Sequence, residues 1–169
     1  MKMTPEEIKK VLENHKHWMR KDCEVWENMR ANLCGADLYG ANLSGAILYG
    51  ANLRGAKNVP FIPMACPDSG LFIGWKRCDG YIVKLLIPED ALRSSATTRK
   101  CRCSKAKVLE IQTLDGKPAT TTYAISNHDS SFIYTVGETV SVNNFDTDRW
   151  HECAPGIHFF INRQEAVDY

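Results

Sequence analysis

The sequence lacks a long hydrophobic run and lacks an excess of charge of one sign. No apolar stretch reaches the roughly 18 residues that a membrane-spanning helix needs, so we expect no transmembrane segment. The 21 lysines and arginines nearly balance the 20 aspartates and glutamates, which leaves a formal net charge of +1. This balance argues against a globally basic nucleic-acid binder and against an acidic tail, although a local charged patch is still allowed.

The N-terminus also lacks the pattern of a signal peptide. Residues 1–21 carry lysines and glutamates throughout, whereas a signal peptide has an apolar central region. We therefore expect the protein to remain in the cytoplasm. The cysteines number seven, an odd count, and we interpret them as reduced thiols or metal ligands rather than as a disulfide framework.

A helix is predicted at the start of the chain. Thr4 is placed to cap it, Pro5 suits the first helical position, and Glu7 completes a capping box. Apolar residues then recur at helical spacing as far as Trp18, so we predict a helix over about residues 5–20. Its apolar stripe must pack against another part of the chain.

A five-residue pattern follows the helix and runs from Ala31 to Gly55: ANLCG ADLYG ANLSG AILYG ANLRG. A glycine at every fifth position would cost a helix about 1 kcal/mol each time. Leucines at the same interval do not give the strict alternation of a flat strand. The period is typical of a chain that turns a corner every five residues, with Ala and Leu inward. Ile47 breaks the outward pattern, and we expect its corner to be covered.

This segment resembles the pentapeptide-repeat proteins, whose unit is A(D/N)LxG. The resemblance implies a right-handed quadrilateral β-helix, with about four pentapeptides per coil and coils stacked at roughly the strand spacing of 4.8 Å. Five units then form about one coil, which has two open ends and needs caps. We expect the N-terminal helix to cap one end and the chain after Gly55 to cover the other.

Charge and length argue against one role that the resemblance suggests. Long pentapeptide-repeat proteins can imitate DNA by presenting an acidic rod to gyrase. In this sequence Asp37 is the only acidic residue at an outward position, and Arg54 offsets it. One coil also has about the height of one strand spacing, so we disfavour DNA mimicry on both grounds.

The chain changes character after the repeat. Residues 58–70 are rich in proline and are predicted to be a linker. Residues 71–169 are predicted to form a compact mainly-β (α+β) domain. Its strands are expected at LFIGWKR, YIVKLLIP, AKVLEIQT, TTTYAI, FIYTVGETVSV and GIHFFI, with a short helix at NRQEAVDY. The expected fold is therefore mainly β, with the capping helix and repeat coil together in residues 1–57.

Two C-terminal segments resemble an uncharacterised domain that follows pentapeptide repeats in phage-encoded and gut-bacterial proteins. They are GYIVKLLIPEDALRSSATTRKCRCSKAKVLEI and DRWHECAPGIHFFINRQEAVDY, and the N-terminal EIKKVLENHKHW fits the same arrangement. The resemblance implies a phage or prophage origin, and hence the host-cell cytoplasm. It implies no activity that can be assigned to particular residues.

A basic segment, RSSATTRKCRCSKAK, spans Arg93 to Lys107 and contains no acidic residue. Guanidinium groups, hydroxyls and loop backbone N–H groups are suited to binding a phosphate or another anion. The alternative is a solvated loop whose charges serve solubility. The candidate ligand-binding residues are Arg93, Ser94, Ser95, Thr97, Thr98, Arg99, Lys100 and Arg102.

Cysteines and histidines form two short pairs in the same half of the sequence. A zinc site needs four nitrogen or sulfur ligands, and Cys101, Cys103, His151 and Cys153 offer four. The C-x-C spacing is tighter than usual for zinc, and residues i and i+2 of a strand can equally be two buried thiols. Zinc and buried thiols are both left open, and no cofactor is expected.

A catalytic pocket is a further alternative in this region. His151, Glu152 and His158, with nearby Arg and Ser residues, are the residue types used in ADP-ribosyl transfer and in other reactions. These types occur in most chains and no motif fixes their geometry. His158 also lies in an apolar run, where a histidine is usually part of the core.

We expect a binding or interaction protein rather than an enzyme. Tyr39, Ile47 and Tyr49 are outward positions of the repeat that offer apolar contacts for self-association or for the adjoining domain. The expected partner is a host protein or a small anionic ligand such as a nucleotide signal, and antagonism of host defence is one role that we consider for the protein. A small nucleotide-dependent enzyme and a structural or scaffolding protein are the alternatives.

Overall fold

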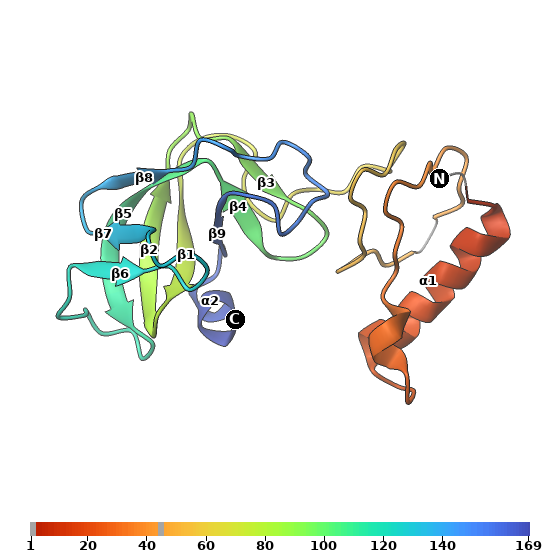
Figure 1. Ribbon diagram of the computed structural model, residues 1–169, viewed down its shortest axis with the longest axis horizontal. Coiled ribbons are helices and arrows are strands. Elements are labelled where there is room, and N and C mark those ends of the chain that lie inside the picture. The colour runs from red at the N-terminus through yellow and green to blue at the C-terminus, as the bar shows by residue number, and fades with distance from the viewer. Residues whose placement is uncertain (1–2, 44–45) are drawn as a thin grey trace. The chain divides into compact units, whose positions relative to one another are not determined.

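The computed structural model describes residues 3–43 and 46–169, and these form two compact units (Figure 1). The first unit, which we call the repeat body, holds the chain up to Pro63 together with Ala96–Thr98 and Asp148–Cys153. The second, the sheet body, holds Met64–Ser95, Arg99–Thr147 and Ala154–Tyr169. Ser44 and Gly45, which end the third pentapeptide, lie outside the described residues.

The N-terminal helix α1 spans Pro5–Arg20, which confirms the prediction. The capping box is present: Thr4 Oγ1 accepts a hydrogen bond from Glu7 N at 3.2 Å, and Thr4 N donates to Glu7 Oε2 at 2.7 Å. The helix ends at Lys21, which has a left-handed backbone and whose N–H donates to His17 O. A short 3-10 helix, η1, follows at Trp26–Met29.

Segments of the repeat pair with one another at an offset of 20 residues. Parallel bridges join Asn32 to Asn52 and Asp37 to Lys57. Within each pentapeptide the carbonyl of the leucine accepts from the N–H of the alanine three residues later, as in Leu33 O with Ala36 N at 3.1 Å. The third position of this turn has a positive φ of 63–76° at the described glycines 35, 40, 50 and 55. Glycine adopts this conformation without steric cost, which explains the period of the sequence.

The alanines and leucines of the repeat point inward, as predicted. Ala31, Ala36, Ala51, Leu33, Leu38, Leu48 and Leu53 are all buried and share one cluster with Ile8 of α1. Val11 and Leu12 of α1 pack against the same cluster. The apolar stripe of α1 therefore packs on the repeat.

Two short segments from later in the sequence complete the repeat body. Asp148 Oδ2 accepts from Gly55 N at 3.2 Å, and Thr97 Oγ1 donates to Ala51 O at 3.2 Å. Trp150 packs against the repeat cluster, and the guanidinium carbon of Arg149 lies 4.4 Å from the centre of its ring. The last pentapeptide is thus tied to side chains that are far from it in sequence.

Every strand pair of the sheet body is antiparallel. One sheet has the order β1-β2-β5-β8, formed by Phe72–Cys78, Tyr81–Ile87, Lys105–Thr113 and Thr139–Ser141. A second has the order β3-β4-β9, formed by Arg93–Ser95, Cys101–Cys103 and Ile157–Phe159. Strands β6 (Tyr123–Ile125) and β7 (Ile133–Thr135) pair with each other, and helix α2 spans Arg163–Asp168.

The strands predicted from the sequence and the C-terminal helix are present, so the mainly-β fold with an N-terminal helix is confirmed. Strands β3 and β4 were not predicted, because they lie in the basic segment that was expected to be a loop. β3 pairs with β4, and the other partner of β4, β9, is more than fifty residues away, so the local sequence carries no sign of this sheet. Among the described residues, no helix has the length and apolarity needed to cross a membrane.

Candidate functional site

The basic segment turns several of its polar groups into the sheet body. Arg93, on β3, stacks its guanidinium carbon 5.1 Å from the centre of the Phe72 ring. Its side chain donates to four backbone carbonyls, those of Gly70, Pro88, Glu89 and Ala91, at 2.8–3.2 Å. Arg93 therefore fixes the chain around the end of β2.

Arg102, on β4, is almost completely buried, with 2% of its surface exposed. It donates to the carbonyl oxygens of Asp146 and Pro155, and its guanidinium carbon lies 4.8 Å from the centre of the Phe145 ring. A buried cation is tolerated when its donors are satisfied in this way. Arg102 is therefore part of the core structure.

The remaining predicted ligand residues are distributed over both bodies. Arg99 pairs with Glu165 at 2.8 Å, and Lys100 Nζ lies 5.6 Å from the centre of the Tyr169 ring. Ser94 and Ser95 are buried, and Ser95 Oγ accepts from Ala65 N at 2.7 Å. Thr97 and Thr98 belong to the repeat body, where the Thr98 hydroxyl donates to Glu152. Of the predicted cations, Arg99 is exposed, Arg93 and Lys100 are half-buried, and Arg102 is buried.

The four residues considered for zinc are also separated. Cys101 and Cys103 are fully buried in the core of the sheet body, whereas His151 and Cys153 belong to the repeat body. Burial raises the pKa of Cys103 to about 12, and the hydrogen bond with Cys66 together with burial raises the pKa of Cys101. Among the described residues these four do not place three ligand atoms within 4.8 Å of one another. The C-x-C pair is thus two buried thiols on β4.

The candidate interface residues are exposed, but they do not share one surface. Tyr39 is 85% exposed, Ile47 59% and Tyr49 47%, so the corner at Ile47 is not covered by the described chain. Tyr39 and Tyr49 line different hollows, and that of Tyr39 is also lined by Ile8 and Asn58.

Tyr49 instead lines a hollow of about 310 Å³ whose side chains are mostly apolar. We call this the repeat hollow, and its walls are Leu43, Ala46, Leu48, Tyr49, Pro60, Phe61, Ile62 and Thr97. Among the described residues that line it, Thr97 and the Tyr49 hydroxyl are the polar groups of side chains, and none is charged. Such a surface suits an apolar side chain better than a phosphate.

Phe61 is the most exposed of the large hydrophobic residues at the repeat hollow, at 90%. It stands between Pro60 and Ile62, in the segment that the sequence predicted to be a linker. The sequence does carry a local signal here: the run PFIP places a phenylalanine and an isoleucine between two prolines. A solvated linker needs no large apolar side chains, so this run could have indicated a contact surface. Phe61 and Tyr49 bring two exposed aromatic rings to one hollow.

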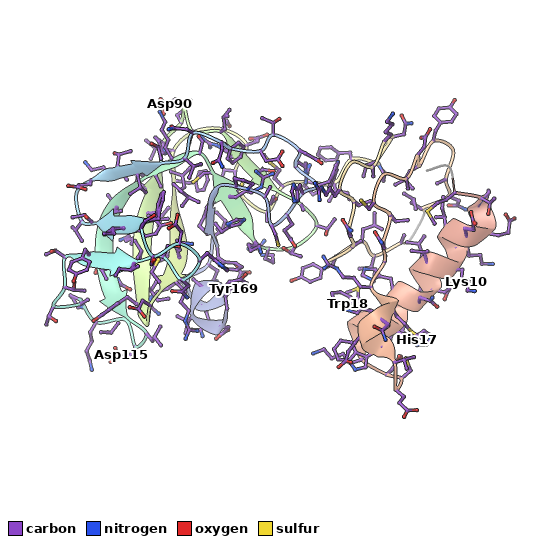
Figure 2. All side chains as sticks on the ribbon, in the orientation of Figure 1. Lys10, His17, Trp18, Asp90, Asp115 and Tyr169 are labelled. Carbon is purple, nitrogen blue, oxygen red and sulfur yellow. The ribbon has the colours of Figure 1, made fainter. Side chains whose placement is uncertain are left out.

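The side chain of His15, on α1, contacts the backbone carbonyl of Tyr49. It is 1% exposed, its Nε2 lies 3.0 Å from Tyr49 O, and its Nδ1 accepts from Ala31 N at 3.2 Å. These partners require the neutral ring with the proton on Nε2, and burial lowers the pKa of His15. Its ring also stacks on Trp18 at 5.1 Å. Figure 2 shows Trp18 on the side of α1 that faces the repeat.

Two family models match the chain. A model described as pentapeptide repeats (8 copies) matches residues 29–57, which confirms the repeat. A model described as a family of unknown function, DUF5758, matches residues 62–166 and so covers more than half of the chain. Searches of curated proteins and of solved structures returned no match.

Proposed function

The chain belongs to the DUF5758 family of unknown function, and we propose that it is a non-enzymatic interaction protein whose contact surface is the repeat hollow. The observation that carries this proposal is the exposure of Phe61, 90%, beside an uncharged hollow of about 310 Å³. Exposed aromatic side chains next to an apolar depression are typical of protein contact sites.

The occupant that fits this surface is a second copy of the chain. The repeat hollow and the protruding Phe61 lie side by side, so a twofold arrangement lets each copy place its Phe61 in the hollow of the other. A volume of about 310 Å³ is at the lower end for ligand pockets and suits one aromatic side chain. Ile47, 59% exposed between the lining residues Ala46 and Leu48, offers further apolar area to a partner.

The expected dimer is weak. Burying one phenylalanine contributes roughly 1.5–3 kcal/mol, so two symmetric anchors contribute about 3–6 kcal/mol, against the cost of losing translational and rotational freedom. Since about 6 kcal/mol corresponds to a dissociation constant of roughly 40 μM even before that cost, association should appear only toward millimolar concentrations. A dimer this weak is sensitive to a single substitution.

The repeat serves as the rigid support of this surface, and we propose that it is a right-handed quadrilateral β-helix of about one coil. Pairing at an offset of 20 residues and a turn at every fifth residue support this geometry. A phage or gut-bacterial origin, a cytoplasmic location and antagonism of host defence belong to the same proposal. The origin rests on the resemblance of the C-terminal segments, the location on the charged N-terminus, and the antagonism on analogy and composition.

The test combines sedimentation with a site-specific crosslinker. Sedimentation of the full chain should show a concentration-dependent dimer, and Phe61→Ser should weaken dimerisation by at least about tenfold. A benzophenone amino acid replacing Phe61 should crosslink one copy to another on illumination. The matched control is the same substitution at Tyr123, which is 53% exposed on the sheet body.

The outcomes separate the possible occupants. Crosslinks between copies that are absent with the control position support the proposal. A monomer at all concentrations, or crosslinks in cells to a different polypeptide only, would overturn the second copy as the occupant. Equal crosslinking from residues 61 and 123 would show that the repeat hollow has no special role.

A second candidate keeps the basic segment as an anion site, reduced to Arg99 and Lys100. The Arg99 side chain is 48% exposed, and Lys100 is its neighbour beside Tyr169. The test is Arg99→Glu with Lys100→Glu, measured by calorimetry with inorganic phosphate and with a mononucleotide. Arg102 is unsuitable for this test, because it is buried and its loss would disturb the fold. Unchanged binding in the double variant ends this candidate.

A further inference from the structure

The turn that follows α1 brings three different metal-binding side chains together. His17 Nδ1, a carboxylate oxygen of Asp22 and Cys23 Sγ all lie within 4.8 Å of one another. Among the described residues, this is the one group in which three such atoms gather so closely. We propose that these three residues form a zinc site, a property distinct from the interaction surface at the repeat hollow.

The backbone explains why residues 17, 22 and 23 meet. Lys21 ends α1 with φ 53° and ψ 39°, and its N–H donates to His17 O at 2.8 Å. This left-handed residue reverses the chain, so the next two side chains return alongside the last helical turn. The ammonium of Lys21 also lies 5.0 Å from the centre of the Trp26 ring, and Cys23 O accepts from Trp26 N at 3.3 Å. The turn is therefore held on both sides.

The distances suit a tetrahedral ion after small side-chain rotations. Zinc binds histidine nitrogen and carboxylate oxygen at about 2.0–2.2 Å and thiolate sulfur at about 2.3 Å, so its ligand atoms are roughly 3.4–3.6 Å apart. In the structure His17 Nδ1 lies 2.7 Å from Asp22 Oδ1, and an ion would separate this pair slightly. Cys23 Sγ would approach from within 4.8 Å.

The surroundings leave room for an ion and for a fourth ligand. The side chains of His17 and Asp22 are 48% and 38% exposed, so an ion can enter from solvent. Met29, at the end of η1, places its thioether sulfur 3.6 Å from Cys23 Sγ. Three protein ligands with an open position for water are a known arrangement for zinc.

The ligand set favours zinc over the other common ions. Calcium and magnesium take oxygen ligands, and only Asp22 offers oxygen here. Copper(I) prefers thiolate and thioether sulfur, which would use Cys23 and Met29 rather than Asp22. The role of Asp22 therefore distinguishes zinc from copper(I). A bound ion would fasten the end of α1 to the turn that leads to η1.

The experiment titrates the reduced, metal-free full chain with Zn²⁺ in competition with a coloured chelator, and with Co²⁺ as a spectroscopic probe. We expect one ion per chain, and a near-ultraviolet sulfur-to-cobalt band that Cys23→Ser removes. His17→Gln and Asp22→Asn should each weaken zinc binding by at least about tenfold, while Met29→Leu should change it little. The matched controls are Cys34→Ser and His128→Gln, which alter exposed residues outside the group.

The result is decided by which variants change the affinity. Affinity that is equal in Cys23→Ser and Cys34→Ser would overturn the site, as would the absence of the sulfur-to-cobalt band. Copper(I) binding that needs Met29 and ignores Asp22 would overturn the choice of zinc. Circular dichroism melts of each variant without metal show whether the fold is retained, and zinc should raise the melting temperature of the wild-type chain but not of Cys23→Ser.

Discussion

The repeat body and the sheet body satisfy their polar side chains in opposite ways. On the repeat body, Asn52 Nδ2 donates to Asn32 Oδ1 at 3.0 Å on the outside of the coil, where water can replace either partner. In the sheet body, Arg102 is 2% exposed and Lys76 8% exposed, and both donate to backbone carbonyls, that of His158 in the case of Lys76. Water cannot replace a lost partner of a buried polar group. Similar substitutions should therefore lower the free energy of unfolding by very different amounts in the two bodies.

The largest expected effect is that of Arg102→Ala. It leaves the carbonyls of Asp146 and Pro155 without this donor and removes the cation from the Phe145 ring, so the free energy of unfolding should fall by about 3–5 kcal/mol. Urea unfolding followed by tryptophan fluorescence measures the loss. The control is Arg99→Ala, in which an exposed ion pair should cost about 0–1 kcal/mol. Equal losses in the two variants would contradict the comparison.

The second largest loss is expected at a glycine of the repeat body, where a substitution should lower the free energy of unfolding nearly as much as one in the sheet body. Gly50 has φ 76°, and a Cβ there would lie 2.7 Å from the Trp18 ring, so Gly50→Ala should cost about 2–4 kcal/mol. Gly40 has φ 71° and open space around it, so Gly40→Ala should cost only about 1–2 kcal/mol. The difference between the two isolates the packing of Trp18. If thermal melts show the same loss for both, α1 does not pack tightly on the repeat.

The features that could be predicted from the sequence are those that depend on residues close together along the chain. Helix α1 and the five-residue turn depend on neighbours within five positions, such as Thr4 with Glu7, and both were predicted. Strand β4 depends on β9, where Arg102 lies opposite His158, and a basic segment gives no local sign that it will be buried. The same holds for the anion site, because the inward turn of Arg93 follows from carbonyls in another loop.

The two candidate sites show the same dependence on range. The repeat hollow is lined by Leu43 and Tyr49 of the repeat and by Phe61 of the segment predicted to be a linker. These residues meet through the fold of the chain, which the local sequence does not indicate. The proposed zinc ligands could have been noticed in the sequence, since His17 and Cys23 are only six residues apart. Their meeting, however, requires the left-handed conformation of Lys21, which the sequence does not mark with the usual glycine.

His15 is the exception within the repeat body, a buried polar side chain that resembles those of the sheet body. His15→Leu removes the hydrogen bonds to Tyr49 O and Ala31 N and leaves both backbone groups buried, so it should cost about 1.5–3 kcal/mol. His15→Gln, which can restore one of the two bonds, should cost less. Urea unfolding measures both, and a loss below about 0.5 kcal/mol for His15→Leu would mean that the helix needs no polar link to the coil.

The smallest effect is expected on the outer face of the coil. Asn52→Ala removes the bond to Asn32 and the bond from Arg54 N to Asn52 Oδ1, but water reaches all of these groups. The loss should be about 0.5–1 kcal/mol, several times less than for Arg102→Ala, although both variants remove hydrogen bonds of a side chain. The exposure of the bonded groups then sets much of the cost. The same urea titration could instead show equal losses for Asn52→Ala and Arg102→Ala. That result would mean that the hydrogen bonds of Asn52 are a main source of stability in the repeat.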